Sequence, residues 1–148
     1  MAKEYDPRMH SAEHLLNRTM DRMFACGRSV NTHLERKKSK CDYPLGRDLR
    51  PEEVREIERV INGFVAADLP VREEFLPREK AAAAFNLSRL PGEAGDSIRI
   101  IRIGDYDACP CIGSHVASTA MIGEFRIVST GWSDGILRVR FRLAPPQG

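Results

Sequence analysis

Two short motifs with the same internal spacing, far apart in the chain, constrain the fold more than any other feature. His10 and His14 are four residues apart in "HSAEH", and Cys111 and His115 are four residues apart in "CIGSH". On a helix, this spacing puts both side chains of a pair on one face, one turn apart. Three imidazoles and one thiolate suit tetrahedral zinc. Because Cys111 lies 97 positions after His14, the fold must bring the two pairs together in a cleft of the core.

Each pair has a simpler interpretation when it is taken alone. Histidines four residues apart are often solvent-facing or hydrogen-bonded side chains without a ligand role. The two matched pairs together use three of the four histidines, which strengthens the case for a site. Cys109 could replace Cys111 as the thiolate, but Pro110 between them and the spacing to His115 favour Cys111.

The first motif also fits a protease pattern. "HSAEH" matches H-x-x-E-H, the inverted zinc-protease motif in which the glutamate is a general base. Glu13 would be that base, and Glu56 or Glu58 could supply the further acidic ligand. This alternative leaves "CIGSH" unexplained, and a chain of 148 residues has little room for a peptide-binding cleft. We therefore favour the site built from both pairs.

Composition limits the class of protein. The chain is 42% hydrophobic and 30% charged, and no apolar run approaches the roughly 18 residues that cross a membrane. The charged beginning of the sequence lacks the apolar stretch of a secretory signal, so we expect a cytoplasmic protein with no membrane partner. In the cytoplasm, cysteines are thiols or metal ligands rather than parts of disulfides. We interpret Cys26 and Cys41 as small core residues. The net charge of +2 does not by itself indicate nucleic-acid binding.

Capping residues and hydrophobic periodicity predict helices at about 7–26, 51–67 and 76–85. Asp6 is the expected N-cap of the first helix and Pro7 its first residue. The second helix begins at Pro51, has acidic residues in its first turn, and ends before Pro70. The third is short and rich in alanine.

Alternating and β-branched segments predict strands at 98–104, 122–130 and 136–143, with weaker signals near 28–34 and 70–75. "WSDG" is the expected hairpin turn between the last two strands. "SRLPGEAGD" is typical of a loop, and "APPQG" of a frayed end. The pattern predicts one α+β domain over residues 1–148, in two layers, with helices packed on a largely antiparallel sheet and the metal site in the cleft.

Four segments in this order and spacing resemble a known family: "HSAEHLL", "RPEEVREIERVINGFV", "LPREKAAAAF" and "CPCIGSHVASTAMIGEFRI". They are similar to the editing domain of alanyl-tRNA synthetase and to its free-standing relatives, the AlaX trans-editing proteins. The resemblance covers most of the chain. It implies a short, stand-alone zinc-dependent deacylase that hydrolyses seryl- or glycyl-tRNA for alanine. The zinc ligands that it implies are His10, His14, Cys111 and His115.

The resemblance also implies a substrate contact. Thr32 in "VNTHL" lies where short members of the family place a threonine that senses the serine hydroxyl. Asn31 and His33 would face the other way on a strand, and they are the alternatives if the register differs by one residue. The chain departs from the common "CGGTH" at Ile112 and Ser114, which predicts a different pocket wall. The zinc could activate water or position the substrate, and no catalytic side chain is assigned beyond the metal ligands.

Two basic segments are candidates for tRNA binding. In "RVRFR", Arg138, Arg140 and Arg142 alternate with apolar residues, so one face of the strand is basic. "ERKKSK" adds Lys37 and Lys38. A plain solvated surface is the alternative for both segments. A non-catalytic, zinc-stabilised RNA-binding module is the alternative to the hydrolase.

Overall fold

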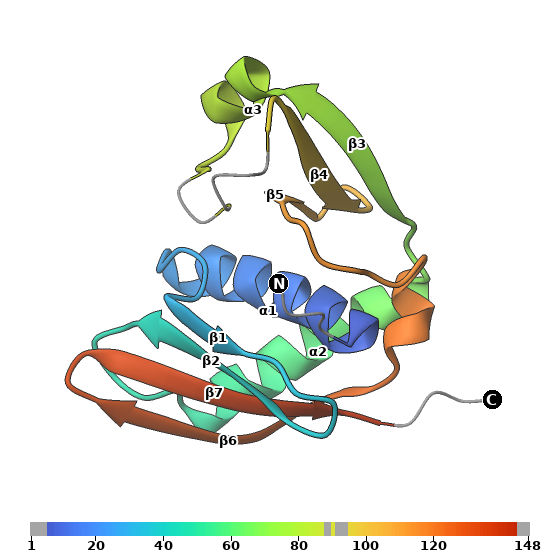
Figure 1. Cartoon of the computed structure of the whole chain (residues 1–148). Coiled ribbons are helices and arrows are strands. Elements are labelled where there is room, and N and C mark those ends of the chain that lie inside the picture. Colours follow the sequence, from blue (N-terminus) through green and yellow to red (C-terminus); the bar gives the residue numbers. More distant parts are fainter. Residues whose placement is uncertain (1–5, 88–89, 91–94, 145–148) are drawn as a thin grey trace.

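The computed structural model describes residues 6–87, 90 and 95–144, and its elements form two antiparallel sheets with helix α1 between them (Figure 1). The helices are α1 (Pro7–Phe24), α2 (Pro51–Ala67), α3 (Arg78–Ala84) and the short 3₁₀ helix η2 (Thr119–Ile122). The strands are β1 (Asn31–His33), β2 (Ser39–Pro44), β3 (Val71–Pro77), β4 (Ser97–Ile103), β5 (Asp107–Pro110), β6 (Phe125–Ser133) and β7 (Ile136–Leu143). One sheet has the order β1-β2-β7-β6 and the other the order β3-β4-β5.

Helix α1 begins where its capping residues predict. The Asp6 carboxylate accepts hydrogen bonds from the backbone N–H groups of Arg8 (2.9 Å) and Met9 (3.3 Å), which no helical carbonyl could satisfy. The helix ends at Phe24, two residues before the predicted end, because Ala25 adopts the left-handed conformation with φ of 53°. Its core-facing residues include Met9, Ala12, Leu15, Leu16 and Met20.

Helix α2 has the predicted bounds. The Glu53 carboxylate accepts a hydrogen bond from the backbone N–H of Arg50 at 2.8 Å, which satisfies the helix start. Ile57 and Ile61, one turn apart, are fully buried against the larger sheet. Both α1 and α2 therefore cover the same, inner face of that sheet, as Figure 1 shows.

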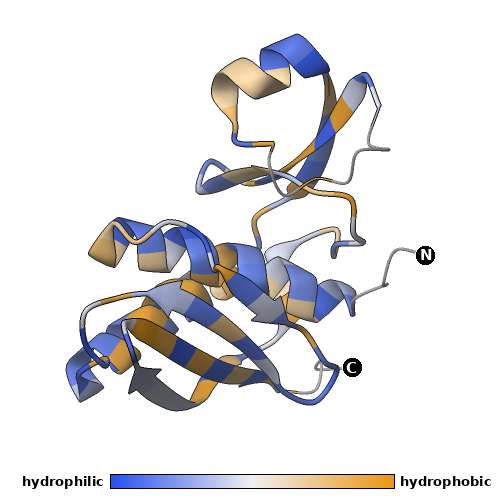
Figure 2. Cartoon of the chain, turned by 60° about the vertical axis from the view of Figure 1, so that its left-hand side comes forward, coloured by the Kyte–Doolittle hydropathy of each residue, from blue (hydrophilic) through white to orange (hydrophobic). Residues whose placement is uncertain are grey.

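Strand β7 places its apolar and basic residues on opposite faces. Leu137, Val139 and Phe141 are fully buried, whereas the arginines between them face outward. Figure 2 shows the same alternation of hydrophobic and hydrophilic residues along the strand. The predicted strand bounds and the two faces of this strand are confirmed.

The hairpin between β6 and β7 turns at Asp134 and Gly135, with φ of 51° and 81°. Two residues with positive φ match the twist of a tight hairpin, and a glycine accepts the second position without strain. The predicted turn at "WSDG" is confirmed. The predicted strand start at 122 was wrong, because residues 119–122 form η2 and β6 begins at Phe125.

Other elements, in both sheets, differ from the sequence prediction. The helix predicted at 76–85 begins at Arg78, because Leu76 and Pro77 still pair with β4. Strands β2 and β5 were not predicted, and the strand predicted near 28–34 is limited to β1. The predicted loop at 88–96 and the chain end at 144–148 lie mostly outside the described residues.

The α+β class with helices on antiparallel sheet is confirmed, but the strands divide into two sheets rather than one. The buried core between α1, α2 and the larger sheet contains Cys41, and Cys26 packs against its edge. Among the described residues, no helix has both the length and the apolar character needed to cross a membrane.

Candidate metal centre

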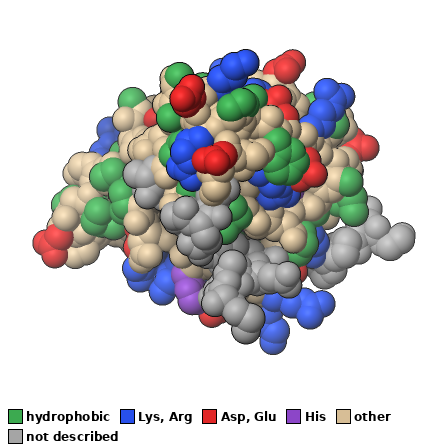
Figure 3. All heavy atoms as spheres, turned by 45° about the horizontal axis from the view of Figure 1, so that its top comes forward, with side chains coloured by type: hydrophobic (Ala, Val, Ile, Leu, Met, Phe, Trp, Pro, Cys, Tyr) green, Lys and Arg blue, Asp and Glu red, His purple; other side chains and the backbone are tan. Residues whose placement is uncertain are grey.

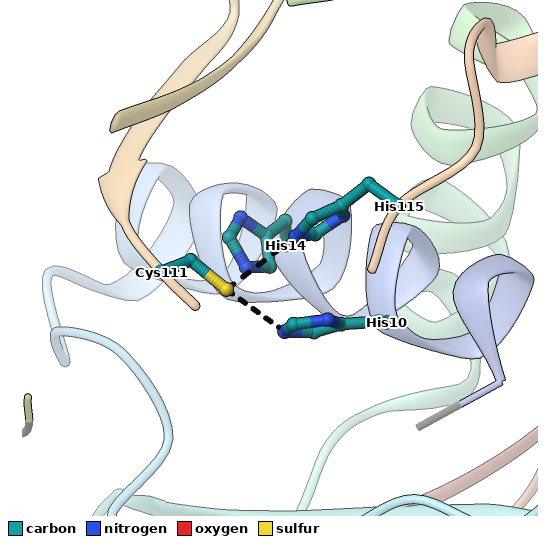
Figure 4. A group of neighbouring side chains, drawn as sticks. All are labelled: His10, His14, Cys111 and His115. Carbon is teal, nitrogen blue, oxygen red and sulfur yellow. Dashed lines mark hydrogen bonds between the residues drawn. The ribbon is translucent and has the colours of Figure 1, made fainter. Parts of the chain in front are cut away.

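The structure brings together the four side chains of the two motifs. His10 and His14 lie on α1 and are 5% and 3% exposed. Cys111 and His115 lie in the segment between β5 and η2. One potential ligand atom from each residue lies within 4.8 Å of all the others. Figure 4 shows the four side chains converging on one point, two from the helix and two from the segment opposite.

Cys111 rather than Cys109 is the cysteine in this group. The Cys111 Sγ lies 3.1 Å from His10 Nε2 and 3.5 Å from His115 Nε2. Burial alone would raise the pKa of Cys111, but hydrogen bonds from His10, His115 and His14 lower it to about 3. Burial raises the pKa of Cys109 to about 12. Cys111 is thus the thiolate, the form that binds metal ions.

Two imidazoles are oriented by contacts of their outer nitrogens. His10 Nδ1 lies 3.2 Å from the carbonyl oxygen of Ser114, and an N–H there can donate to it. His115 Nδ1 lies 2.9 Å from the Ser11 hydroxyl, which also accepts from the backbone N–H of Val116 at 3.2 Å. With the proton on Nδ1, each Nε2 atom would offer its lone pair to a metal ion bound beside the Cys111 sulfur, in place of the hydrogen bond that it otherwise makes to that sulfur.

His14 has a buried carboxylate behind it. Its Nδ1 lies 3.4 Å from Asp107 Oδ2 without hydrogen-bond alignment, and it is the one buried side-chain nitrogen or oxygen among the described residues that lacks a hydrogen bond. Asp107 also accepts from Arg18 Nε at 3.1 Å and Arg28 Nη1 at 3.0 Å. Burial alone would raise the pKa of Asp107, but His14 and Arg28 hold it well below its usual value. Burial lowers the pKa of His14, yet the contacts with Asp107 and Cys111, followed by the negative charge of Glu13, raise it to about 9.

Arg99 fixes the segment that carries Cys111. Its Nη1 donates to the carbonyl oxygens of Gly113 (2.7 Å) and Cys111 (3.2 Å), and its Nε donates to Glu73 at 2.7 Å. Sequence reasoning missed this residue, since an arginine within "IRIIRIG" indicates only the exposed face of a strand. Asp107 and Ser11 were missed for the same reason: their roles depend on neighbours distant in sequence.

Gly113 is required by the packing of the site. A Cβ at this position would lie 2.3 Å from His10 Cε1 and 2.5 Å from His10 Nδ1, closer than any real contact. The glycine inside "CIGSH" therefore lets the segment approach the imidazole. Ile112 is 52% exposed and lines a surface hollow of about 250 Å³ together with Phe75 and Arg99. The donor set, its burial and this close approach fit a metal ion, and the four residues could hold one.

Thr32 lies on β1, apart from the metal group. Its hydroxyl contacts the Ser29 hydroxyl and lies 3.9 Å from Cys41 Sγ. It is partly buried, whereas Asn31 and His33 are exposed on the other face of the strand. The structure thus turns Thr32 inward, as the alternation predicts, and leaves its role as a substrate contact a prediction.

The arginines of β7 lie on the outer face of the larger sheet. The buried side of the sheet and α1 separate them from the metal group. Arg138 forms a bidentate ion pair with Asp42, at 2.8 and 2.9 Å. Arg140 is opposite Lys40, and Arg142 is opposite Arg126. Like charges placed directly opposite each other are unfavourable, and Arg126 is paired with Glu124 at 3.0 Å.

The lysines of the second basic segment lie beside this face. Lys37 and Lys38 are exposed between β1 and β2. Lys38 lines a shallow pocket of about 250 Å³ together with Lys40, Arg140 and Glu35. On the side of the molecule shown in Figure 3, basic and acidic side chains are intermixed.

The protease alternative lacks its second acidic residue. Glu13 lies 3.9 Å from His14 Nε2. Glu56 pairs with Arg59 at 2.6 Å, and Glu58 accepts a hydrogen bond from the backbone N–H of Ile127 at 2.8 Å. Neither belongs to the metal group among the described residues.

Comparison with known proteins agrees with the motifs. Residues 98–140 match the family described as the threonyl and alanyl tRNA synthetase second additional domain. The chain is 32% identical over 134 residues to an alanine–tRNA ligase of Geobacillus kaustophilus, which covers 88% of this chain and 15% of that protein. It is 32% identical over 136 residues to the ligase of Coxiella burnetii, with 89% of the chain and 16% of the ligase covered.

A third alanine–tRNA ligase, from Methanothrix thermoacetophila, is 34% identical over 140 residues, which cover 90% of this chain and 15% of that ligase. The chain thus spans about 15% of the length of the ligases that it matches. The matched region includes the segment with Cys111 and His115 and continues into β7. Residues 98–140 therefore belong to the family described as the threonyl and alanyl tRNA synthetase second additional domain, and most of the chain is similar to one part of alanine–tRNA ligases.

Proposed function

We propose that this chain is a zinc-dependent hydrolase that removes serine or glycine from wrongly charged tRNA for alanine, with residues 1–148 acting as one editing domain in the cytoplasm. The observation that carries the proposal is the convergence of His10, His14, Cys111 and His115 within 4.8 Å. Family membership supports the link to alanyl-tRNA. A synthetase pocket for alanine cannot strongly exclude glycine or serine, so a second, hydrolytic site supplies the missing specificity.

The reaction is the hydrolysis of an ester. The oxygen of water forms a bond to the carbonyl carbon, the bond from that carbon to the ribose oxygen breaks, and the ribose oxygen takes a proton. A free amino acid and an intact tRNA result. When bound by the four residues, zinc supplies Lewis acidity for this step. Ser11, the Ser114 carbonyl and Asp107 keep the three imidazoles oriented.

We assign recognition of the serine hydroxyl to Thr32. Serine differs from alanine by one hydroxyl, and a pocket hydroxyl that bonds it is left unpaired by alanine, which can cost orders of magnitude in rate. Thr32→Val keeps the shape and removes the hydroxyl. It should lower the hydrolysis of seryl-tRNA relative to glycyl- and alanyl-tRNA, whereas an unchanged serine-to-alanine ratio would exclude Thr32 as the sensor.

We assign binding of the tRNA phosphate backbone to the basic surface formed by β7 and the β1–β2 turn. The contributors would be Arg140, Arg142, Lys37 and Lys38; Arg140 also donates a hydrogen bond to the Ser129 hydroxyl at 3.3 Å, and Arg138 is held by Asp42. Because metal group and basic surface lie on opposite sides of α1, these residues would contact phosphates distant from the 3′ end. Replacing Arg140 and Arg142 by glutamine should weaken tRNA binding and reduce its salt dependence, with zinc content unchanged. If the dependence of tRNA binding on salt concentration is unchanged, these residues form a solvated surface that does not contact the tRNA.

The test of the proposed function is the deacylation of seryl-tRNA for alanine by matched cysteine variants. Cys111→Ser should lose both zinc and deacylation, whereas Cys109→Ser, two residues away, should keep both. Loss of zinc only in Cys109→Ser would mean that the other cysteine is the ligand. Zinc-loaded wild-type protein that binds tRNA but deacylates neither seryl- nor glycyl-tRNA would instead be an RNA-binding module.

A further inference from the structure

Glu13 is the one acidic side chain beside the metal group for which the proposed chemistry has no use. Its side chain is only 12% exposed, and its Oε1 lies 3.9 Å from His14 Nε2. No described residue donates a hydrogen bond to this carboxylate. Arg28, whose pKa the charge of Glu13 helps to raise, is already bound to Asp107 through both Nη atoms, at 3.0 and 3.3 Å. A carboxylate this buried is costly unless a cation pairs with it.

Helical geometry fixes the direction in which Glu13 lies. His10 and His14 form one stripe of α1, which faces Cys111 and His115. Glu13 and Asn17 are also four residues apart and form the neighbouring stripe. The Asn17 side-chain oxygen accepts hydrogen bonds from the backbone N–H of Ser29 at 3.2 Å and from the Tyr43 hydroxyl at 2.6 Å, so this stripe faces β2 and the segment that leads to β1.

That segment ends at the proposed serine sensor. The Ser29 hydroxyl, next to the Asn17 contact, hydrogen-bonds the Thr32 hydroxyl. Thr32 in turn contacts Cys41. The pKa of the Cys41 thiol is raised chiefly by burial, and after burial by the negative charge of Glu13. Glu13 is therefore next to the metal group through His14, and it lies on the stripe of α1 that faces the segment leading to Thr32.

The substrate carries a cation at the corresponding place. In an aminoacyl ester, the α-carbon bears the reacting carbonyl, the amino acid side chain and an ammonium group. If the carbonyl lies at the metal group and the serine hydroxyl at Thr32, the α-carbon lies between them and its ammonium group can project toward Glu13. We propose that Glu13 binds the α-ammonium group of the aminoacyl ester, and so selects substrates with a free amino group. This inference rests on the proposed function, because it uses the substrate's orientation.

The first experiment measures binding without any reaction. Calorimetry on zinc-loaded protein compares serinamide, which keeps the ammonium and resists hydrolysis, with N-acetylserinamide, which lacks it. Wild-type protein should bind serinamide on the order of tenfold or more tightly, as expected for a charge-assisted hydrogen bond. Glu13→Gln should lose this preference and keep its zinc. Glu56→Gln, on the exposed part of α2, is the matched control and should keep both.

The results separate this inference from the proposed function. Equal binding of the two ligands by wild-type protein, or no measurable binding of serinamide, would overturn the role of Glu13 even if seryl-tRNA is hydrolysed. A Glu13-dependent preference without any deacylation would support the ammonium site and reject the proposed reaction.

The second experiment tests whether Glu13 acts instead as a general base on the attacking water. Hydrolysis of seryl-tRNA is compared with that of N-acetyl-seryl-tRNA. Glu13→Gln should slow the first substrate and leave the second nearly unchanged, because the acetylated ester offers no ammonium. Equal slowing of both substrates would overturn the inference.

Discussion

The two sheets of the molecule are stabilised in different ways. The larger sheet packs with α1 and α2 around an extensive core in which Tyr43 and Phe141 are fully buried. The core of the smaller sheet and α3, among the described residues, consists of Ala81, Ile98 and Ile100 with partly buried neighbours. This cluster alone is too small to offset the conformational entropy of ordering three strands and a helix, and the smaller sheet also depends on Ile103 of β4, which belongs to the larger core.

Contacts at the metal centre supply part of what the smaller sheet lacks. Asp107 on β5 bonds Arg18 and Arg28, and the Cys111 thiolate after β5 contacts His10 on α1. The candidate metal group thus lies at the junction of a well-packed unit and a weakly packed one. The helix supplies two fixed ligands, and the other two should become ordered with the metal ion.

Substitutions in the two cores should show most strongly that the larger sheet is more stable than the smaller one. Phe141→Ala opens a cavity in the larger core and should cost about 3–5 kcal/mol of the free energy of unfolding. Ile98→Ala in the smaller core should lower the global stability less and mainly accelerate amide hydrogen exchange in β3 and β4. Denaturant unfolding with hydrogen exchange measures both. An equal loss of global stability in the two variants would mean that the sheets unfold as one unit.

Gly113→Ala tests the junction itself. The added Cβ collides with the His10 ring, so the segment and the imidazole must separate. We expect zinc affinity to fall by on the order of a hundredfold, similar to the loss of an important outer contact, while the larger sheet keeps its stability. Gly46→Ala is the control, because a Cβ there meets nothing within 4 Å. Competition with a chelator measures the affinity, and unchanged affinity would refute the close approach.

Asp107→Asn removes the charge behind His14 and keeps the side-chain shape. We expect zinc affinity to fall about 10–100-fold, since the imidazole loses its outer carboxylate. Exchange in β5 should also increase because Arg18 and Arg28 lose their anionic partner. Asp105→Asn, in the exposed turn before β5, should change neither quantity. If hydrogen exchange in β5 increases but zinc affinity does not change, Asp107 stabilises the contact between β5 and α1 and does not support metal binding.

A smaller effect on stability is expected from the ion pair between Asp42 and Arg138 on the outer face of the larger sheet. Hydrogen bonds from Arg138 hold the pKa of Asp42 below its usual value of 3.8. A carboxyl whose pKa is lowered in the folded protein stabilises it above that usual value, and the contribution is lost as the pH falls toward the lowered pKa. Asp42→Asn should therefore be slightly less stable than wild type near neutral pH, and the difference should shrink below about pH 3.8. A difference independent of pH would exclude this ion pair as its source.

In both sheets, the sequence predicts elements with strong local signals better than elements defined by pairing with distant strands. The bounds of α2 and β7 follow from local signals: an acidic first turn, proline at the start, and strict alternation of apolar residues. Strand β2, with "SKCDYP", and strand β5, with "DACP", have no such alternation. They are strands because β7 and β4 offer them pairing partners, and pairing between distant segments leaves no local pattern.

The metal group could be found from the sequence because its spacing is local within each pair. Its supporting residues could not. Arg99 and Asp107 act through residues that precede or follow them by many positions, and only the fold shows that they meet. Glu13 was recognisable as a candidate acid inside "HSAEH", but its direction toward Thr32 depends on the contacts of Asn17.

The most direct measurement is a zinc titration of metal-free protein with seryl-tRNA deacylation as the readout. The account predicts that deacylation is absent without metal, increases in proportion to added zinc, and reaches its maximum at one ion per chain, as expected for one site of four ligands. Full deacylation by metal-free protein, or none with one zinc bound to His10, His14, Cys111 and His115, would contradict it.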